Sequence, residues 1–164
     1  MNLENAAEAT FWLVEQGGCQ GIFHAMAEED LERILRHPTT SIASDGEVPI
    51  FGRANPHPRS YGTFARVLGF YVREKHTLTL EDAIRKMTGL PASRLNLMDR
   101  GILRPGLKAD IAIFDAATVR DTATFEKPMA YPEGIAHVVV NGKVVLENGK
   151  RTRQRPGRPL LHSP

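Results

Sequence analysis

Two charged residues, Asp45 and Arg59, offer the chemistry that this sequence could perform. Asp45 lies in the segment Ser44-Asp45-Gly46, where an apolar stretch ends in a turn and the glycine allows a ligand to come close. Its carboxylate can act as a general base or a metal ligand, or it can simply cap a loop. Arg59 follows fourteen residues later. Its guanidinium group can bind a carboxylate or phosphate through two hydrogen bonds, or it can remain solvated near a helix start.

Other sequence motifs narrow the possible chemistry. The six histidines are at least thirteen residues apart, so none forms a local zinc-binding pair. His57 could be a ligand, but its position between Pro56 and Pro58 favours a structural role in a loop. The single cysteine, Cys19, excludes an intramolecular disulfide and a cysteine-cluster zinc site, and we interpret it as structural. Phosphate-binding loops, dinucleotide fingerprints and serine-hydrolase elbows do not occur in the sequence, so phosphoryl transfer, hydride transfer and serine-hydrolase chemistry have no support.

The elements that would carry Asp45 alternate between helix and strand. Apolar residues at helical spacing over residues 3–14 predict a helix, and residues 21–23 predict a buried strand. A second helix is expected from Glu28 to His37, and residues 40–44 predict another short strand. This order is typical of an α/β fold, in which active-site residues lie at the carboxyl ends of strands. Asp45 would occupy such an end.

The middle of the chain is predicted to be helical. Three prolines and a glycine predict a loop over residues 47–58, and a helix follows around residues 64–71. Thr79 and Asp82 resemble a capping box at the start of another helix, with Gly89 as its C′ residue and a short turn of helix from Pro91. The expected buried stripes of the helices are Leu31, Ile34 and Leu35; Phe64, Val67, Leu68 and Tyr71; and Leu80, Ala83, Ile84 and Met87.

The last third of the chain is predicted to be rich in β-structure. Strands are expected over residues 110–114 and 135–140, and Asn141-Gly142 predicts a type I′ hairpin that leads into residues 144–146. Residues after Glu147 are polar and are expected to be poorly ordered.

Length and composition fit one globular domain. The chain has 164 residues, of which 41% are hydrophobic and 24% charged, so a coiled coil, a collagen-like repeat and a disordered acidic tail are excluded. It is too short for a complete (β/α)₈ barrel, which needs about 250 residues. No apolar run is long enough to predict a membrane span, and the start of the sequence lacks the features of a signal peptide. We therefore expect a cytoplasmic location and no membrane partner.

Charge is concentrated at the end of the sequence. Five of the 21 basic residues lie between positions 150 and 158 without an acidic neighbour, which leaves 16 basic against 19 acidic residues elsewhere. This basic tail has no interleaved aromatic residues that could stack on bases. We expect no nucleic-acid partner, although binding of nucleic acid by the tail is an alternative that salt-dependent DNA binding would reveal.

Several segments along the chain form an ordered series. The segments are AMAEEDL at 25–31, SDG at 44–46, HPR at 57–59, YGTFARVLG at 61–69, RKMTGLPA at 85–92, GILRPG at 101–106, ADIAIFD at 109–115, and the stretch from Gly134-Ile135 to Val140-Asn141-Gly142. This series resembles the C-terminal part of the N-acyl-D-amino-acid deacylases (D-aminoacylases) of the amidohydrolase superfamily. The resemblance covers roughly residues 20 to 160, and the order of the segments makes it far more specific than any one of them.

The resemblance implies a fold and a division of the chain. Residues 1–108 would form the last βα units of a metal-dependent (β/α)₈ barrel together with a helical segment. Residues 109–150 would form the C-terminal part of a small β-sandwich, and residues 151–164 would be a basic tail.

The resemblance also implies zinc-assisted hydrolysis of the amide bond of N-acyl-D-amino acids. Asp45 matches the catalytic aspartate, a possible metal ligand, which would accept a proton from metal-bound water and pass it to the departing amine. Arg59 matches the arginine that would hold the α-carboxylate of the substrate and help to select the D-enantiomer.

The histidines and the cysteine that hold the metal in the family have no match in this sequence. We therefore expect the chain by itself to be an incomplete, inactive piece that binds zinc weakly.

The predicted strands lack neighbours, and this leads us to expect a protein partner. The strands that contain Ile22 and Ile42, and the hairpin at Asn141-Gly142, would be left with open edges, which invite pairing with another chain. We expect a homo-oligomer or a complementing N-terminal half. The alternative to an enzyme is a non-catalytic assembly module that pairs through these edges.

Overall fold

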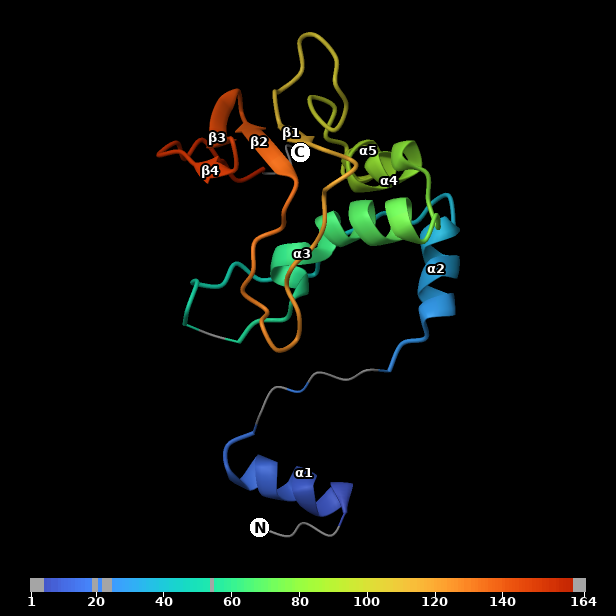
Figure 1. Ribbon diagram of the computed structural model, residues 1–164, viewed down its shortest axis with the longest axis vertical. Helices are drawn as coiled ribbons and strands as arrows, with labels where there is room; N and C mark the ends of the chain where they lie inside the picture. Colours follow the sequence, from blue (N-terminus) through green and yellow to red (C-terminus); the bar gives the residue numbers. More distant parts are fainter. Residues whose placement is uncertain (1–4, 19–20, 22–24, 54, 161–164) are drawn as a thin grey trace.

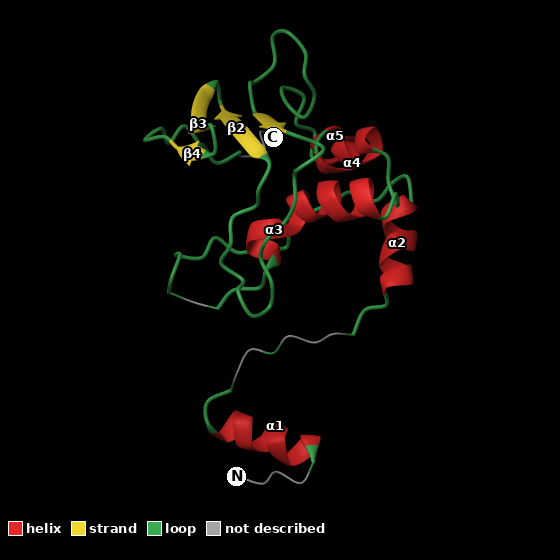
Figure 2. Ribbon diagram, viewed as in Figure 1, coloured by secondary structure: helices red, strands yellow, loops and turns green. Residues whose placement is uncertain are grey.

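Helices form the first part of the protein and a small antiparallel sheet forms the last part (Figures 1 and 2). The computed structural model describes residues 5–18, 21, 25–53 and 55–160. The helical elements are α1 (Ala6–Glu15), α2 (Glu28–Arg36), α3 (Arg59–Arg66), the π-helical segment η1 (Val67–Glu74), α4 (Leu80–Met87) and α5 (Gly89–Arg94). The strands are β1 (Ile111–Phe114), β2 (Ile135–Val140), β3 (Lys143–Glu147) and β4 (Lys150–Arg151).

Local sequence signals set the ends of the helices. The hydroxyl of Thr79 accepts a hydrogen bond from the amide of Asp82 at 3.2 Å, as expected of a cap at the start of α4. In α2, acidic residues occupy the first turn and Arg33 and Arg36 the last, which suits the helix dipole. Gly89 follows Thr88, the C-cap of α4, and so occupies the predicted C′ position; α5 begins at the same residue.

A π-helical segment continues α3 without a break. The amide of Lys75 donates to the carbonyl of Phe70, five residues earlier, at 2.8 Å. Gly69 lies within this segment against residue 119, and a β-carbon added there would lie 2.7 Å from the carbonyl oxygen of Val119. The segment after β1 can therefore approach the helix closely only because residue 69 is glycine.

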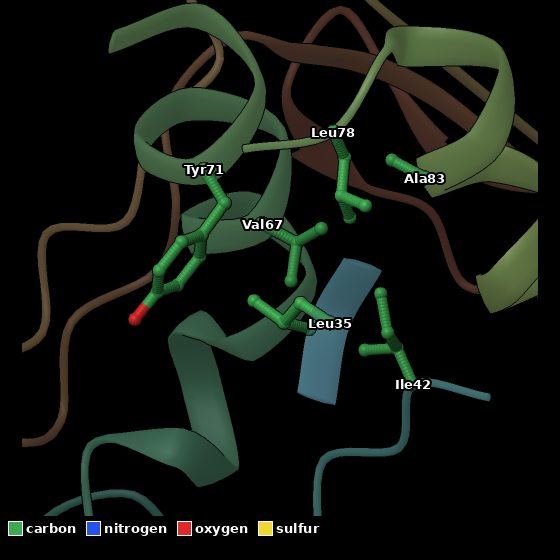
Figure 3. Packing of buried hydrophobic residues seen from close by; sticks show 6 residues of the cluster. All are labelled: Leu35, Ile42, Val67, Tyr71, Leu78 and Ala83. Atoms are coloured by element: carbon green, nitrogen blue, oxygen red, sulfur yellow. The ribbon is translucent and has the colours of Figure 1, made fainter. Parts of the chain in front are cut away.

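Two apolar clusters hold α2, α3, η1 and α4 together and join them to the sheet. The first contains Leu35, Ile42, Val67, Tyr71, Leu78 and Ala83, whose side chains come together from α2, η1, α4 and the segments next to them (Figure 3). The second is built around Ala65, Leu68 and Val119 and includes Phe114 and Ile135 of the sheet. The helix stripes were predicted largely correctly. The exceptions are Ile34 and Phe64, which are 55% and 45% exposed.

Residues 40–44 do not form the strand that the sequence predicted. Among the described residues no strand pairs with them, and the amide of Ile42 donates to the carbonyl of Lys86 at 3.0 Å. An apolar stretch can be buried against a helix as well as in a sheet, which hydrophobicity alone does not distinguish. The predicted strand at residues 21–23 lies outside the described residues except for Gly21, and Cys19 also lies outside them.

The sheet has the strand order β1-β2-β3-β4, and every neighbouring pair is antiparallel. Asn141 and Gly142 both have positive φ, 45° and 75°, which confirms the predicted hairpin between β2 and β3. Residues 150–156 are more ordered than predicted. Lys150–Arg151 pair with β3 as strand β4, and the carbonyl of Pro156 accepts a hydrogen bond from the side chain of Asn141 at 2.9 Å.

The first helix stands apart from the other elements (Figure 1). Asn5 caps α1, since its side chain accepts a hydrogen bond from the amide of Glu8 at 3.0 Å. None of its residues is buried, and Phe11 is 71% exposed. Among the described residues, the longest apolar helical stretch falls short of what a membrane crossing requires.

A buried lysine fastens α4 to the turn that follows α2. The side chain of Lys86 is fully buried; its ammonium group donates to the carbonyls of His37 and Thr40 and lies 3.8 Å from a carboxylate oxygen of Asp82. Burial of a charged group is tolerated when it is hydrogen-bonded in this way. The turn at residues 37–40 leads directly to the segment that ends at Asp45.

Replacement of this lysine should destabilise the protein. In Lys86→Ala the carbonyls lose their charged donor and the side-chain stem leaves a void, so the free energy of unfolding should fall by about 3 kcal/mol in urea denaturation. The matched control is Arg33→Ala on α2, whose side chain is 83% exposed, with a change below about 0.5 kcal/mol. Equal effects of the two substitutions would contradict this account of Lys86.

Candidate functional site

Asp45 lies at a turn that ends the segment after α2. Its φ is 46°, in the left-handed region that aspartate tolerates better than most residues. The amide of Gly46 donates to the hydroxyl oxygen of Ser44 at 3.2 Å, which closes the turn. The turn directs the chain towards the first residues of α3.

Gly46 lets the turn lie directly on α3. A β-carbon added at residue 46 would lie 2.8 Å from the Cα of Ser60, which is closer than real side chains allow. Next to it, the amide of Glu47 donates to the hydroxyl oxygen of Ser60 at 3.2 Å. Only glycine therefore fits between the turn and the helix, and this contact places Asp45 beside the helix N-terminus.

Arg59 is the first residue of α3 and follows the N-cap residue Pro58. Its amide donates to Nδ1 of His57 at 3.1 Å, so Nδ1 acts as an acceptor and holds no proton in this contact. The ring of His57 packs edge-on against Phe125, with 5.2 Å between ring centroids. His57 is thus a structural loop residue, as the flanking prolines predicted, and it holds the backbone of Arg59.

The structure brings Asp45 and Arg59 together. The Nη2 atom of Arg59 lies 2.9 Å from Oδ2 of Asp45. The two side chains are 44% and 85% exposed, and exposed ion pairs contribute only about 0–1 kcal/mol to stability. The pair is therefore close enough to act on one ligand and weak enough to open when that ligand arrives.

The described residues do not fit a metal centre of their own. Within residues 5–18, 21, 25–53 and 55–160, no three His, Cys, Asp or Glu side chains come together as a possible ligand set. Zinc sites in proteins use three or four side-chain ligands, and Asp45 supplies a single carboxylate. The chemistry available from these residues is therefore proton transfer by a carboxylate and anion binding by a guanidinium group.

Three aromatic residues beside the site were not found from the sequence. Phe51, Tyr61 and Tyr131, called the aromatic cluster below, pack together with ring centroids 5.5–6.2 Å apart. They come from the loop at 47–58, from α3 and from the segment before β2. The available signal was Phe51, an aromatic residue in a loop rich in proline. Its partner Tyr131, in the segment before β2, has no sequence signature.

Comparison with known proteins gives a consistent relationship. The model of the amidohydrolase family matches residues 3–146. Among curated proteins, N-acyl-D-aspartate deacylase of Alcaligenes xylosoxydans xylosoxydans is 46% identical over 139 residues, which are 85% of this chain and 27% of that protein. D-aminoacylase of the same organism is 49% identical over 142 residues, 87% of this chain and 29% of that protein. The chain thus spans less than a third of the length of these relatives.

Solved structures show the same similarity in three dimensions. A D-aminoacylase structure that defines a subset of amidohydrolases matches 79% of this chain and 27% of its own, with a TM-score of 0.73 and 47% identity. N-acyl-D-glutamate deacylase from Bordetella bronchiseptica, complexed with zinc and a phosphonate inhibitor, matches 73% of this chain and 25% of its own, with a TM-score of 0.68 and 47% identity. The resemblance to deacylases is confirmed, and the chain belongs to the amidohydrolase family.

Proposed function

We propose that this chain supplies the proton-transfer and carboxylate-binding residues of an enzyme that hydrolyses the amide bond of N-acyl-D-amino acids. The observation that carries the proposal is the 2.9 Å contact between Asp45 and Arg59, which places a base and an anion-binding group side by side. The identity of 46–49% to three deacylases of N-acyl-D-amino acids supports this substrate class.

Arg59 is proposed to bind the α-carboxylate of the substrate. A guanidinium group can form two parallel hydrogen bonds with a carboxylate, which fixes both position and orientation. In the structure, the carboxylate of Asp45 occupies this position. Because the pair is exposed and weak, the α-carboxylate of a substrate can take the place of Asp45 on Arg59 and leave Asp45 free for catalysis.

Asp45 is proposed to move a proton between the attacking water and the leaving group. The carboxylate would accept a proton as the water oxygen bonds to the amide carbon, and would donate it to the amide nitrogen as the carbon–nitrogen bond breaks. The products are a carboxylic acid and a free D-amino acid. Binding by Arg59 would hold the scissile amide within reach of Asp45. Proton transfer would then take place within the bound complex and would not require a bimolecular encounter.

The related enzymes contain metal ions: a binuclear metal centre in D-aminoacylase and zinc in the Bordetella enzyme. We propose that zinc also assists the reaction of the complete enzyme. Since the described residues form no ligand cluster, the other ligands would come from outside this set. Asp45 is the one residue proposed here as a possible ligand.

The chain is also proposed to contribute to two parts of a larger fold. The last helix among the described residues ends at Arg94 and the first strand begins at Ile111, which supports a boundary near residues 108 and 109. We propose that the part before this boundary belongs to a (β/α)₈ barrel and that residues 109–150 belong to a small β-sandwich. The basic residues from 151 to 164 would follow as a tail.

Substitution of Asp45 tests the proposed proton transfer. Residues 25–146 would replace the matching segment of the D-aminoacylase relative, and the chimera would be assayed on N-acetyl-D-amino acids. Asp45→Asn should lower kcat by about 10²–10⁴-fold, because the amide cannot accept the proton. Glu47→Gln in the same loop is the matched control and should leave kcat within about twofold. An active Asp45→Asn chimera would refute the role of Asp45.

Substitution of Arg59 tests carboxylate binding in the same chimera. Arg59→Lys keeps the charge but removes the two-pronged geometry, so KM should rise by about tenfold or more while kcat changes less. Arg53→Lys makes the same chemical change in the same loop and should leave KM unaltered. A KM unchanged by Arg59→Lys, or raised equally by both substitutions, would show that Arg59 does not hold the substrate.

A second candidate function is assembly through an exposed strand edge. Strand β1 lies at one edge of the sheet, and Ile113 in it is 49% exposed. Exposed apolar edge strands favour pairing with another chain. Light scattering of the purified chain should then show a homo-oligomer, and Ile113→Lys should shift it towards monomer. A strictly monomeric wild-type chain would remove support for self-assembly.

A further inference from the structure

The two residues of the site are joined by a loop that has little structure of its own. Residues 47–58 connect the turn at Asp45 to the start of α3 at Arg59. Among the described residues of this loop, one backbone hydrogen bond joins two loop residues: the amide of Arg53 donates to the carbonyl of Ile50 at 3.1 Å. Its geometry must therefore be fixed by contacts with other parts of the protein.

A second segment, residues 120–133, lies beside this loop. It is part of the connection between β1 and β2. Figure 1 shows it next to the loop below α3. The two segments are about seventy positions apart in the sequence, yet Gly52 and Met129 are hydrogen-bonded: the amide of Gly52 donates to the Sδ atom of Met129 at 3.0 Å. This segment is called the 120–133 arm below.

The 120–133 arm has its own supports, independent of the loop. Arg120 and Glu133 close its base through two backbone hydrogen bonds of 3.2 and 3.0 Å and an ion pair of 2.6 Å. Asp121 binds Arg66 of α3 at 3.2 Å and packs against Gly62, where an added β-carbon would lie 2.9 Å from the Cβ of Asp121. The arm is thus fastened to the same helix that begins with Arg59.

The arm contacts the middle of the loop through the aromatic cluster. The ring of Phe51 stacks on the ring of Tyr131 with 5.6 Å between centroids and 12° between planes. Tyr61 of α3 meets both rings edge-on, at 6.2 and 5.5 Å. Phe51 and Tyr131 remain 56% and 60% exposed, so this contact orders a surface loop and does not belong to the apolar core.

The arm also contacts the end of the loop, next to Arg59. Phe125 packs edge-on against the ring of His57, and Nδ1 of His57 accepts the hydrogen bond from the amide of Arg59. A chain of direct contacts therefore runs from the arm through His57 to the backbone of Arg59. This route is separate from the stacking of Tyr131 on Phe51.

We propose that the 120–133 arm positions the loop between Asp45 and Arg59, with Tyr131 and Phe125 as positioning residues. Tyr131 acts through Phe51 on the middle of the loop, and Phe125 acts through His57 on its end. The consequence for catalysis rests on the proposed function, since it concerns the placing of Asp45 and Arg59. The positioning itself is a property of the folded chain and can be measured without substrate or turnover.

Trypsin cleavage after Arg53, in the middle of the loop, reports how firmly the loop is held. Removal of the Tyr131 ring in Tyr131→Ala should raise the rate of this cleavage by about five- to tenfold, since the loop loses the ring that stacks on Phe51. Tyr131→Phe keeps the ring and should stay within about twofold of wild type. Phe11→Ala removes an exposed aromatic ring from α1 and is the matched control. Mass spectrometry would identify the fragment that ends at Arg53.

A second readout separates positioning from a general loss of stability. The NMR signal of the Nε–Hε group of Arg59 should shift in Tyr131→Ala and in Phe125→Ala and return to its wild-type position in Tyr131→Phe. The backbone amide signals of Ala83 and Lys86, in the buried part of α4, should not shift. If Tyr131→Ala loses the fold, Phe51→Ala removes the other ring of the stack and undergoes the same two measurements.

The proposal is overturned by either of two results in a folded variant. One is unchanged cleavage after Arg53 together with an unchanged Arg59 signal. The other is an increase in cleavage equal to that of Phe11→Ala. Failure of the chimeric enzyme to hydrolyse N-acyl-D-amino acids would refute the proposed function and leave these two measurements unaffected.

Discussion

The arrangement of the candidate site depends on a steric constraint at Gly46. The turn that carries Asp45 lies so close to the first turn of α3 that a single added carbon would collide with the backbone of Ser60. This approach brings Asp45 within 2.9 Å of Arg59 although the loop between them has little regular structure. A site built in this way needs a firm helix on one side and a firm turn on the other. The buried ammonium group of Lys86 and the contacts of α3 with Asp121 supply these supports.

The ion pair itself contributes little to stability, and this weakness suits the proposed role. A buried, strong pair between Asp45 and Arg59 would lock both groups and resist a substrate carboxylate. The observed pair is largely exposed. It keeps the two side chains oriented towards each other, and little free energy is needed to separate them. The rigid part of the site is therefore the backbone, and the exchangeable part is the pair of side chains.

Local signals predicted much of the structure, and tertiary contacts account for the rest. The acidic start of α2, the Thr79 cap and the Asn141-Gly142 turn act within a few residues, and each was visible in the sequence. The prediction of a strand at 40–44 was wrong: the amide of Ile42 donates to the carbonyl of Lys86 in α4, and no strand within the described part of the chain pairs with this segment. The burial of Lys86 and the stacking of Phe51 on Tyr131 depend on residues more than forty positions away, and neither has a local pattern. Asp45 and Arg59 were predicted to belong to one site because the family resemblance assigns a role to each. Their spacing in the sequence alone does not connect them.

The most direct test of the account is the NMR signal of the Arg59 Nε–Hε group in the wild-type chain and in Asp45→Asn, recorded as N-acetyl-D-alanine is added. Loss of the carboxylate at position 45 should move this signal in the free chain, and the ligand should bring the signals of the two proteins towards a common position as its own carboxylate takes the guanidinium group. A signal that is the same in both free proteins and indifferent to the ligand would contradict the claim that these two residues form one site.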